Sequence, residues 1–146
     1  MNRQRLKPLQ QLAEEREQLH ARELAERQRT LAAQEQRLTE ITRYAQEYAR
    51  LAPGLVDPAL LANRRAFIEK LDTALVQQRQ HVESAREGCE SGRARLVRAS
   101  RDVAVLDRLA AGYMARELRT AELRAQRELD DHAIRRHRSS CSDGDE

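Results

Sequence analysis

The sequence predicts an all-α fold, a two-helix antiparallel coiled-coil hairpin whose second helix is longer than the first. Charged residues make up 35% of the 146-residue chain and aromatic residues only 3%, which leaves few large apolar side chains for a globular core. Glycine and proline are scarce, whereas Ala, Leu, Glu, Arg and Gln, all strong helix formers, dominate. Apolar residues recur at alternating intervals of three and four, which is the coiled-coil pattern.

The first helix is predicted over residues 8–51. Pro8 suits its first turn, where the missing N–H costs little. Because Pro53 disfavours helical geometry at the residue before it, the helix should end near Leu51. The predicted seam of this helix has one register break, after which it resumes: Leu9, Leu12, Arg16 and Leu19, then Leu24, Arg27, Leu31, Gln34, Leu38, Ile41, Ala45 and Tyr48.

Residues 52–57 form the predicted loop, where Pro53-Gly54 and Pro58 are the strong turn signal. Asp57 is a good N-cap with Pro58 at the first helical position, so the second helix should span residues 58–138. Residues 1–138 are predicted to be a single hairpin domain, and residues 139–146 a disordered tail. The predicted seam of the second helix has one stutter, before Val82: Arg64, Phe67, Leu71, Ala74, Gln78, Val82, Ala85, Cys89, Gly92, Leu96, Ala99, Val103, Leu106, Ala110 and Tyr113.

Folding the chain symmetrically about residue 54 predicts which residues meet across the hairpin. The expected pairs are Ile41 with Phe67 or Ile68, Leu38 with Leu71, Leu31 with Gln78, and Arg16 with Gly92. Residues 104–138 then overhang the first helix. They keep an apolar stripe, which we expect a partner to cover; the alternative is a frayed, marginal helix end.

Nothing in the sequence predicts an enzyme, a cofactor, a metal site or a small-molecule ligand. His132 and His137 are five residues apart and do not share a helical face as zinc ligands do. Cys89 and Cys141 are distant in sequence and are expected to be reduced thiols. Acidic residues are interleaved with the arginines at i,i+4 spacing, which is typical of a solvated coiled-coil flank and not of a nucleic-acid stripe. No apolar run approaches 18 residues, so a cytoplasmic location is expected.

The hairpin tip is the candidate binding surface. Three residues of the first helix and four of the second lie at helical spacing there: Ile41, Tyr44, Tyr48, Phe67, Leu71, Ala74 and Gln78. They could simply be the best-packed end of the seam. Tyr44, however, does not fit the seam, and an exposed aromatic residue beside apolar neighbours is typical of a recognition patch.

Several segments match a known family in their order around the loop. They are Leu9-Gln-Gln-Leu12-Ala13-Glu14, Tyr44-x-x-x-Tyr48 preceded by Ile41, Asn63-x-x-x-Phe67-Ile-x-x-Leu71, and Glu128-Leu-Asp-Asp131-x-Ala133 before a basic end. With these segments the chain resembles the FliJ family of the bacterial flagellar export apparatus over nearly its whole length.

The resemblance implies a non-enzymatic component of flagellar protein export, a type III secretion process required for flagellum biogenesis and motility. Such proteins look like the central stalk of rotary ATPases. They bind the flagellar export ATPase hexamer and its regulator, the membrane protein of the export gate, and substrate-specific export chaperones. The implied location is cytoplasmic, peripherally associated with the inner membrane at the flagellar base.

By position, the resemblance assigns gate binding to Ile41, Tyr44, Tyr48, Phe67, Leu71, Ala74 and Gln78, and ATPase binding to the opposite end with the overhang. Gln78 stands where some relatives have histidine, and Leu96 and Leu106 stand about where relatives often have tryptophan. Two alternatives remain at this stage: the equivalent stalk of a virulence type III secretion system, and a generic structural coiled-coil oligomer.

Overall fold

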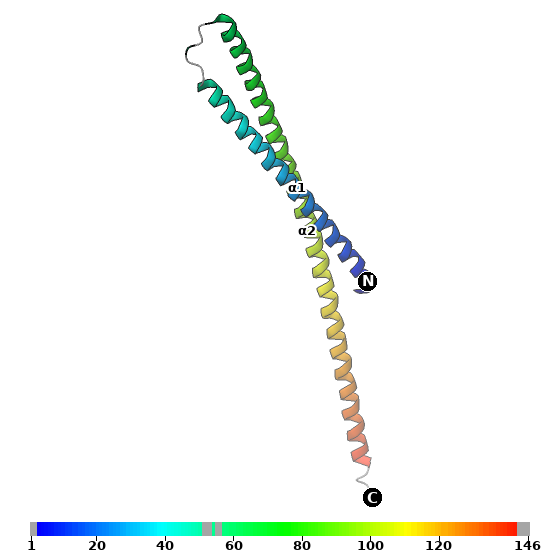
Figure 1. The fold of residues 1–146 in the computed structure, drawn as a ribbon. Coiled ribbons are helices and arrows are strands. Elements are labelled where there is room, and N and C mark those ends of the chain that lie inside the picture. The colour runs from blue at the N-terminus through cyan, green and yellow to red at the C-terminus, as the bar shows by residue number, and fades with distance from the viewer. Residues whose placement is uncertain (1–2, 51–53, 55–56, 143–146) are drawn as a thin grey trace. The chain divides into compact units, whose positions relative to one another are not determined.

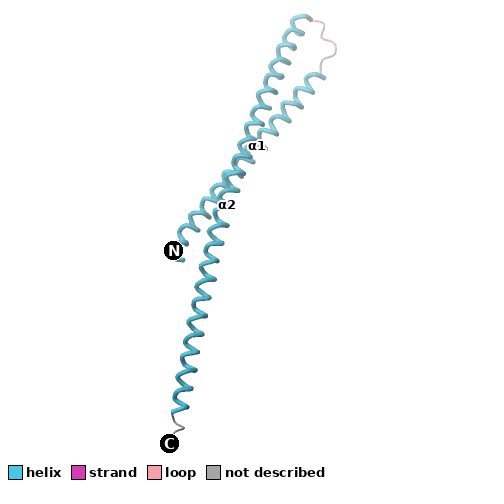
Figure 2. The backbone as a smooth tube through the Cα atoms, turned by 180° about the vertical axis from the view of Figure 1, so that it is seen from behind, coloured by secondary structure: helices cyan, strands magenta, loops and turns pink. Residues whose placement is uncertain are grey.

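Two helices make up the part of the chain that the structure, a computed structural model, describes: residues 3–50, 54 and 57–142. Helix α1 spans Arg3–Arg50 and α2 spans Pro58–Ser142 (Figure 1). They form an antiparallel hairpin with a longer second helix, as predicted. The tube in Figure 2 shows the same two helices from behind, with no strand among the described residues.

Helix α1 begins at Arg3, so the prediction that Pro8 would lie in the first turn is wrong: Pro8 lies inside the helix. A proline there removes one backbone hydrogen bond, a local cost that side-chain packing must offset. Leu6 supplies such packing, because it is only 1% exposed and is the most buried large side chain among the described residues. The predicted end at Leu51 lies outside the described residues.

Helix α2 ends at Ser142, beyond the predicted end at residue 138. Part of the predicted disordered tail is therefore helical, while residues 143–146 lie outside the described residues. The sequence has no proline or glycine between Gly112 and Ser142 that would stop the helix. The hydroxyls of Ser139 and Ser140 also donate hydrogen bonds to the carbonyls of Arg136 and His137, at 2.9 and 3.0 Å.

The predicted start of α2 is confirmed in detail. The backbone N–H of Ala59 donates to the Asp57 carboxylate at 3.0 Å, which is the N-cap interaction. The N–H of Leu61 donates to the Asp57 carbonyl at 3.1 Å and closes the first turn. In the preceding loop Gly54 has φ of 123°, a conformation that favours glycine because other residues have a Cβ.

The chain divides into two compact units, each containing a stretch of both helices. One unit is Glu14–Ser100 and includes the loop, and we call it the tip unit. The other consists of Met1–Ala13 and Arg101–Glu146, and we call it the open-end unit.

The seam of α2 follows the prediction at every position. All the predicted seam residues from Arg64 to Tyr113 are buried or half-buried, and Val82, Cys89 and Ala99 are among the least exposed. The stutter before Val82 is also present in the burial pattern. Beyond Tyr113, every residue of α2 from Met114 to Cys141 is exposed.

The seam of α1 follows the prediction only from Leu24 onwards. Before that residue the prediction is wrong, because Leu9, Leu12, Arg16 and Leu19 are all exposed. The buried or half-buried residues are instead Leu6, Gln10, Ala13, Glu17 and His20. These continue the three-and-four spacing of the later seam without a break. Residues Val82 to Tyr113 of α2 also have no break, so over this stretch the two helices share one period, as coiled-coil packing favours.

The register also differs from the symmetric prediction. Gln78 contacts Gln34 instead of Leu31, and Phe67 packs against Tyr44 and Tyr48 instead of Ile41. Likewise, Gly92 faces Leu24 and Arg27 instead of Arg16.

Part of the shift in register is visible at the loop. There α2 begins beyond the end of α1, so its first turns have no partner helix (Figure 1), and Leu60 and Leu61 remain about half exposed.

Small residues bring the helices of the tip unit close together at mid-length. A Cβ added at Gly92 would lie 3.3 Å from Cδ of Arg27 and 3.8 Å from the Leu24 Cα, so a larger residue has little room. The Arg27 guanidinium donates a hydrogen bond to the Gly88 carbonyl at 2.7 Å. The aliphatic part of Arg27 thereby fills a seam position while its charged group is satisfied.

A polar layer interrupts the apolar seam of the tip unit at Gln78, which is 8% exposed. Its amide nitrogen donates to the backbone carbonyl of Gln34 at 2.9 Å and to the Gln34 side-chain oxygen at 2.7 Å. A buried polar pair of this kind disfavours other registers, because any shift would leave polar atoms unpaired.

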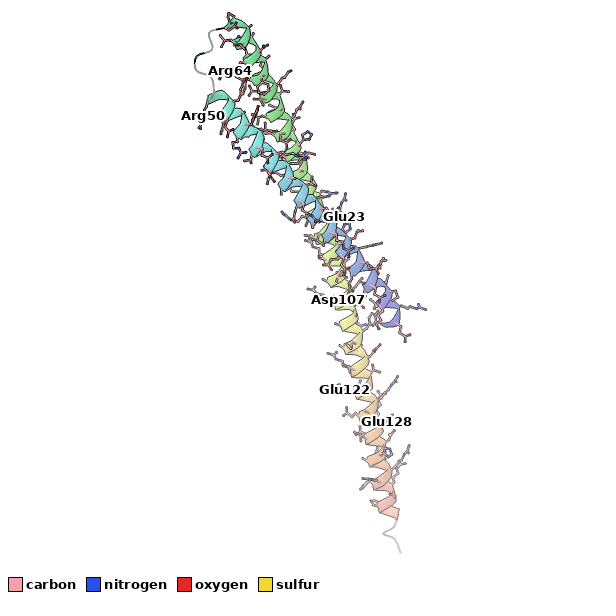
Figure 3. The ribbon with its side chains drawn as sticks, viewed as in Figure 1. Glu23, Arg50, Arg64, Asp107, Glu122 and Glu128 are labelled. Atoms are coloured by element: carbon pink, nitrogen blue, oxygen red, sulfur yellow. The ribbon has the colours of Figure 1, made fainter. Side chains whose placement is uncertain are left out.

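In the open-end unit the first turns of α1 pack on α2. Leu6 is buried, and Val103, Leu106 and Ala110 of α2 are half-buried. The amide nitrogen of Gln10 donates to the Asp107 carboxylate at 3.0 Å. Figure 3 shows Asp107 on α2 beside the N-terminal part of α1.

Candidate protein-binding site

An aromatic cluster lies where α1 approaches the loop. The rings of Tyr48 and Phe67 are 4.6 Å apart between centroids and tilted by 57°. Tyr44 meets Phe67 edge to face, with centroids 6.4 Å apart and an interplanar angle of 77°. Both arrangements are favourable for aromatic pairs. The tip thus brings together three of the predicted site residues, from both helices.

The three rings differ in their access to water. Tyr48 and Phe67 are half-buried, whereas Tyr44 is 52% exposed. Phe67 therefore supports one edge of a tyrosine whose remaining surface faces solvent. A rigid aromatic side chain with a supported edge loses little conformational entropy on binding, which suits it to anchor a partner.

Arg64 completes the cluster, although the sequence suggested for it only a seam position. Its guanidinium carbon lies 5.9 Å from the Tyr48 ring centroid, a cation–π geometry. Its Nη2 donates to the Ala49 carbonyl at 3.2 Å, near the C-terminus of α1. In Figure 3 Arg64 projects from α2 near the end of α1. Arg64 thus joins α2 to the last turn of α1.

The other four predicted residues lie further from the aromatic cluster or deeper in the seam. Ile41, Leu71 and Ala74 are half-buried. Ala74 also borders a shallow hollow on the surface of α2, together with Ala66, Glu69, Lys70, Thr73 and Gln77. Gln78 is buried against Gln34, so its amide is used within the hairpin.

Leu60 and Leu61 are two further apolar residues at the tip that the sequence analysis did not identify. Both are about half exposed, in the first turns of α2. The only sequence signal was their place before Arg64, where the seam of α2 starts. They enlarge the apolar surface available to a partner at this end of the tip unit.

The chain matches the family model described as the flagellar FliJ protein over residues 1–142. It belongs to the FliJ family. No match was found among curated proteins or among solved structures. This protein is therefore a coiled-coil protein of flagellar export. Its FliJ-family membership implies interaction with other components of the export apparatus.

Among the described residues, no three His, Cys, Asp or Glu side chains are grouped as metal ligands would be. Cys89 is buried and Cys141 exposed, and neither forms a disulfide. Neither helix, over its described residues, has a stretch apolar enough to cross a membrane. The family itself is one of structural, non-catalytic coiled-coil components.

Proposed function

We propose that this FliJ-family protein is a stalk-like coiled coil that links the flagellar export ATPase hexamer to the membrane export gate. The tip contacts the gate. The opposite end, with the overhanging part of α2, contacts the ATPase and its regulator, and the protein handles substrate-specific chaperones. It works in the cytoplasm, at the inner-membrane face of the flagellar base.

The exposed Tyr44 ring, supported by Phe67, is the observation that carries the gate contact. One edge of the ring packs on Phe67, and about half of the side chain stays exposed and available to a partner. Tyr48 packs on the same Phe67 ring, and Ile41, Leu71 and Ala74 are half-buried in the seam; all four would contribute their exposed parts. Gln78 would act indirectly, because its buried pair with Gln34 sets which residues of the two helices meet at the tip.

The ATPase contact is supported by the part of α2 that no second helix covers. Residues 114–141 are all exposed, yet they include Leu118, Leu123, Leu129 and Ile134. Figure 3 shows Glu122 and Glu128 on this part of the helix, with no second helix beside them. A single helix in water gains little from apolar side chains, so a protein partner is the physical explanation for them.

The test of the gate contact is Tyr44→Ala in a binding measurement with the cytoplasmic domain of the export-gate protein. Losing a central aromatic anchor should weaken binding by about tenfold or more, which corresponds to roughly 1.4 kcal/mol or more. Val76→Ala is the matched control, because Val76 is equally exposed on α2 but outside the tip cluster. Circular dichroism should show unchanged helicity in both variants.

The same variants distinguish the two ends of the protein. Tyr44→Ala should bind the export ATPase normally. Among the described residues, a chain ending at Glu117 loses only exposed ones, so it should keep its fold and gate binding but lose ATPase binding. Normal gate binding by a correctly folded Tyr44→Ala variant would refute the tip assignment. Swimming motility restored by the wild type but not by Tyr44→Ala would favour the flagellar role over a virulence system.

A further inference from the structure

The open-end unit has one polar flank and one apolar flank. The seam positions of a heptad are labelled a and d. Gln10 and Ala110 occupy a positions, and Leu6 and Leu106 occupy d positions. Asp107 then occupies an e position and bonds to Gln10 at 3.0 Å. Because the helices are antiparallel, the e positions of both share one flank and the g positions share the other.

The ion pair between Arg86 and Glu35 supports this assignment within the tip unit. Both residues are at e positions, and their side chains approach to 3.4 Å across the helices. The e flank is therefore the side on which polar side chains meet.

On the g flank of the open-end unit the exposed side chains are apolar. Leu9 and Leu109 are the g residues, and each is 43% exposed. Since Gln10 meets Asp107, Leu9 lies at about the level of Leu109. Leu12 and Val105, at the neighbouring c positions, are exposed as well. The heptad positions therefore place four exposed apolar side chains from two helices on one flank, and we call this surface the g-flank groove.

Glycine at the next c position makes the groove deeper at one end. A Cβ added at Gly112 would meet no atom within 4 Å, so the position faces open space. A hollow is present there, lined by Arg108, Leu109, Gly112, Tyr113 and Arg116. A side chain from a docked helix would fit into such a hollow as a knob into a hole.

The charges around the g-flank groove are mostly positive. Arg5 of α1 and Arg101, Arg108 and Arg116 of α2 occupy c, f or g positions there and are exposed. Between residues 101 and 116 of α2, Asp102 is the acidic residue at these positions. Two copies of the groove facing each other would bring arginines together, which disfavours a second copy of this chain as the occupant.

We propose that the g-flank groove binds a partner protein through an amphipathic helix whose apolar stripe is bordered by Glu or Asp. The helix would pack as a third strand of the coiled coil, with its leucines on Leu9, Leu12, Val105 and Leu109 and its carboxylates near the arginines. This inference goes beyond the proposed function. It does not rest on that function, because the test measures binding of a synthetic peptide and uses no export component.

The test uses two synthetic helical peptides of 21 residues with the same leucine stripe. One has Glu at the flanking positions and the other has Lys. Fluorescence anisotropy with the full-length chain should give a Kd on the order of 10 µM for the Glu peptide. The Lys peptide should bind at least about tenfold more weakly. Added salt should weaken binding of the Glu peptide, because it screens the attraction between carboxylates and arginines.

Substitutions place the peptide on the groove. Leu9→Gln and Leu109→Gln should each weaken binding of the Glu peptide about tenfold. Val76→Gln, at an exposed apolar residue of the tip unit, should leave binding unchanged. Arg108→Glu should weaken binding of the Glu peptide and strengthen binding of the Lys peptide. All four side chains are exposed, so helicity and thermal unfolding should stay as in the wild type.

Several results would overturn the proposal. In one, the Glu peptide does not bind, and in another, both peptides bind equally well. A third such result is that Leu9→Gln leaves binding of the Glu peptide unchanged. A wild-type dimer in sedimentation that Leu9→Gln converts to monomer would assign the groove to a second copy. Binding to anionic lipid vesicles that Leu109→Gln abolishes, without peptide binding, would assign it to a membrane surface.

Discussion

The stretches of α1 before and after Leu24 both contain leucines at coiled-coil spacing, but those before Leu24 lie outside the seam, with Leu6 as the exception. Leu31 and Leu38 are half-buried, whereas Leu9 and Leu19 are exposed. In the earlier stretch the seam positions belong largely to polar residues: Gln10, Glu17 and His20.

This difference shows that the part of α2 from Val82 to Tyr113, whose period is uninterrupted, decides the seam of the early part of α1, even where that exposes leucines. The polar seam residues have other interactions that make them tolerable. Gln10 bonds to Asp107, and a Glu17 carboxylate oxygen accepts a hydrogen bond from the Ser100 hydroxyl at 2.7 Å. The leucines that point outward then become available to other molecules. One stretch of α1 is specialised for the hairpin, and the other combines hairpin packing with an apolar outer face.

The largest effect should come from comparing Leu24→Ala with Leu19→Ala. Leu24 is 9% exposed and Leu19 is 53% exposed. Leu24→Ala removes a packed side chain and should lower the free energy of unfolding by about 2–4 kcal/mol. Leu19→Ala should change it by less than about 0.5 kcal/mol, as is usual for surface sites. Urea denaturation followed by circular dichroism measures both, and equal losses would contradict the observed seam.

How much of this fold could be predicted varies along the chain for a physical reason. Helix α2 has apolar or small residues at nearly all seam positions, so its pattern identified the seam and its stutter. The early part of α1 offers two competing stripes, and the leucine-rich one is not the seam. Apolar character alone cannot distinguish a surface that packs within the chain from one that faces outward.

The sequence predicted several residues of the tip site but not the contacts between them. Tyr44 was recognised because it lies outside the seam, and it is indeed the exposed ring. The partners of Phe67 could not be derived, because the pairing assumed a symmetric loop, whereas α2 starts beyond the end of α1. Arg64, Leu60 and Leu61 were missed for the same reason, since their surroundings depend on that offset.

The next largest effect should distinguish two glycines of α2. Gly92 lies where the helices approach closely, and Gly92→Leu would force its side chain against Leu24 and Arg27. That substitution should destabilise the protein by about 1–3 kcal/mol. Gly112→Ala meets open space and should stabilise α2 by up to about 1 kcal/mol, the difference in helix propensity. Thermal unfolding of both variants checks the opposite signs, and stabilisation by Gly92→Leu would contradict the close approach.

The smallest effect should be the coupling between Gln34 and Gln78. Gln34 and Gln78 are each replaced by alanine singly and then both at once. The free energies of unfolding of the three variants should give a coupling energy of about 1 kcal/mol. Glu35 and Arg86, also across the hairpin but about half exposed, provide the matched cycle and should couple by less than about 0.5 kcal/mol. A Gln pair that couples no better than this surface pair would mean that its hydrogen bonds do not select the register. The offset at the tip would then have to come from the packing of Phe67 between Tyr44 and Tyr48, and Phe67→Leu should shift it.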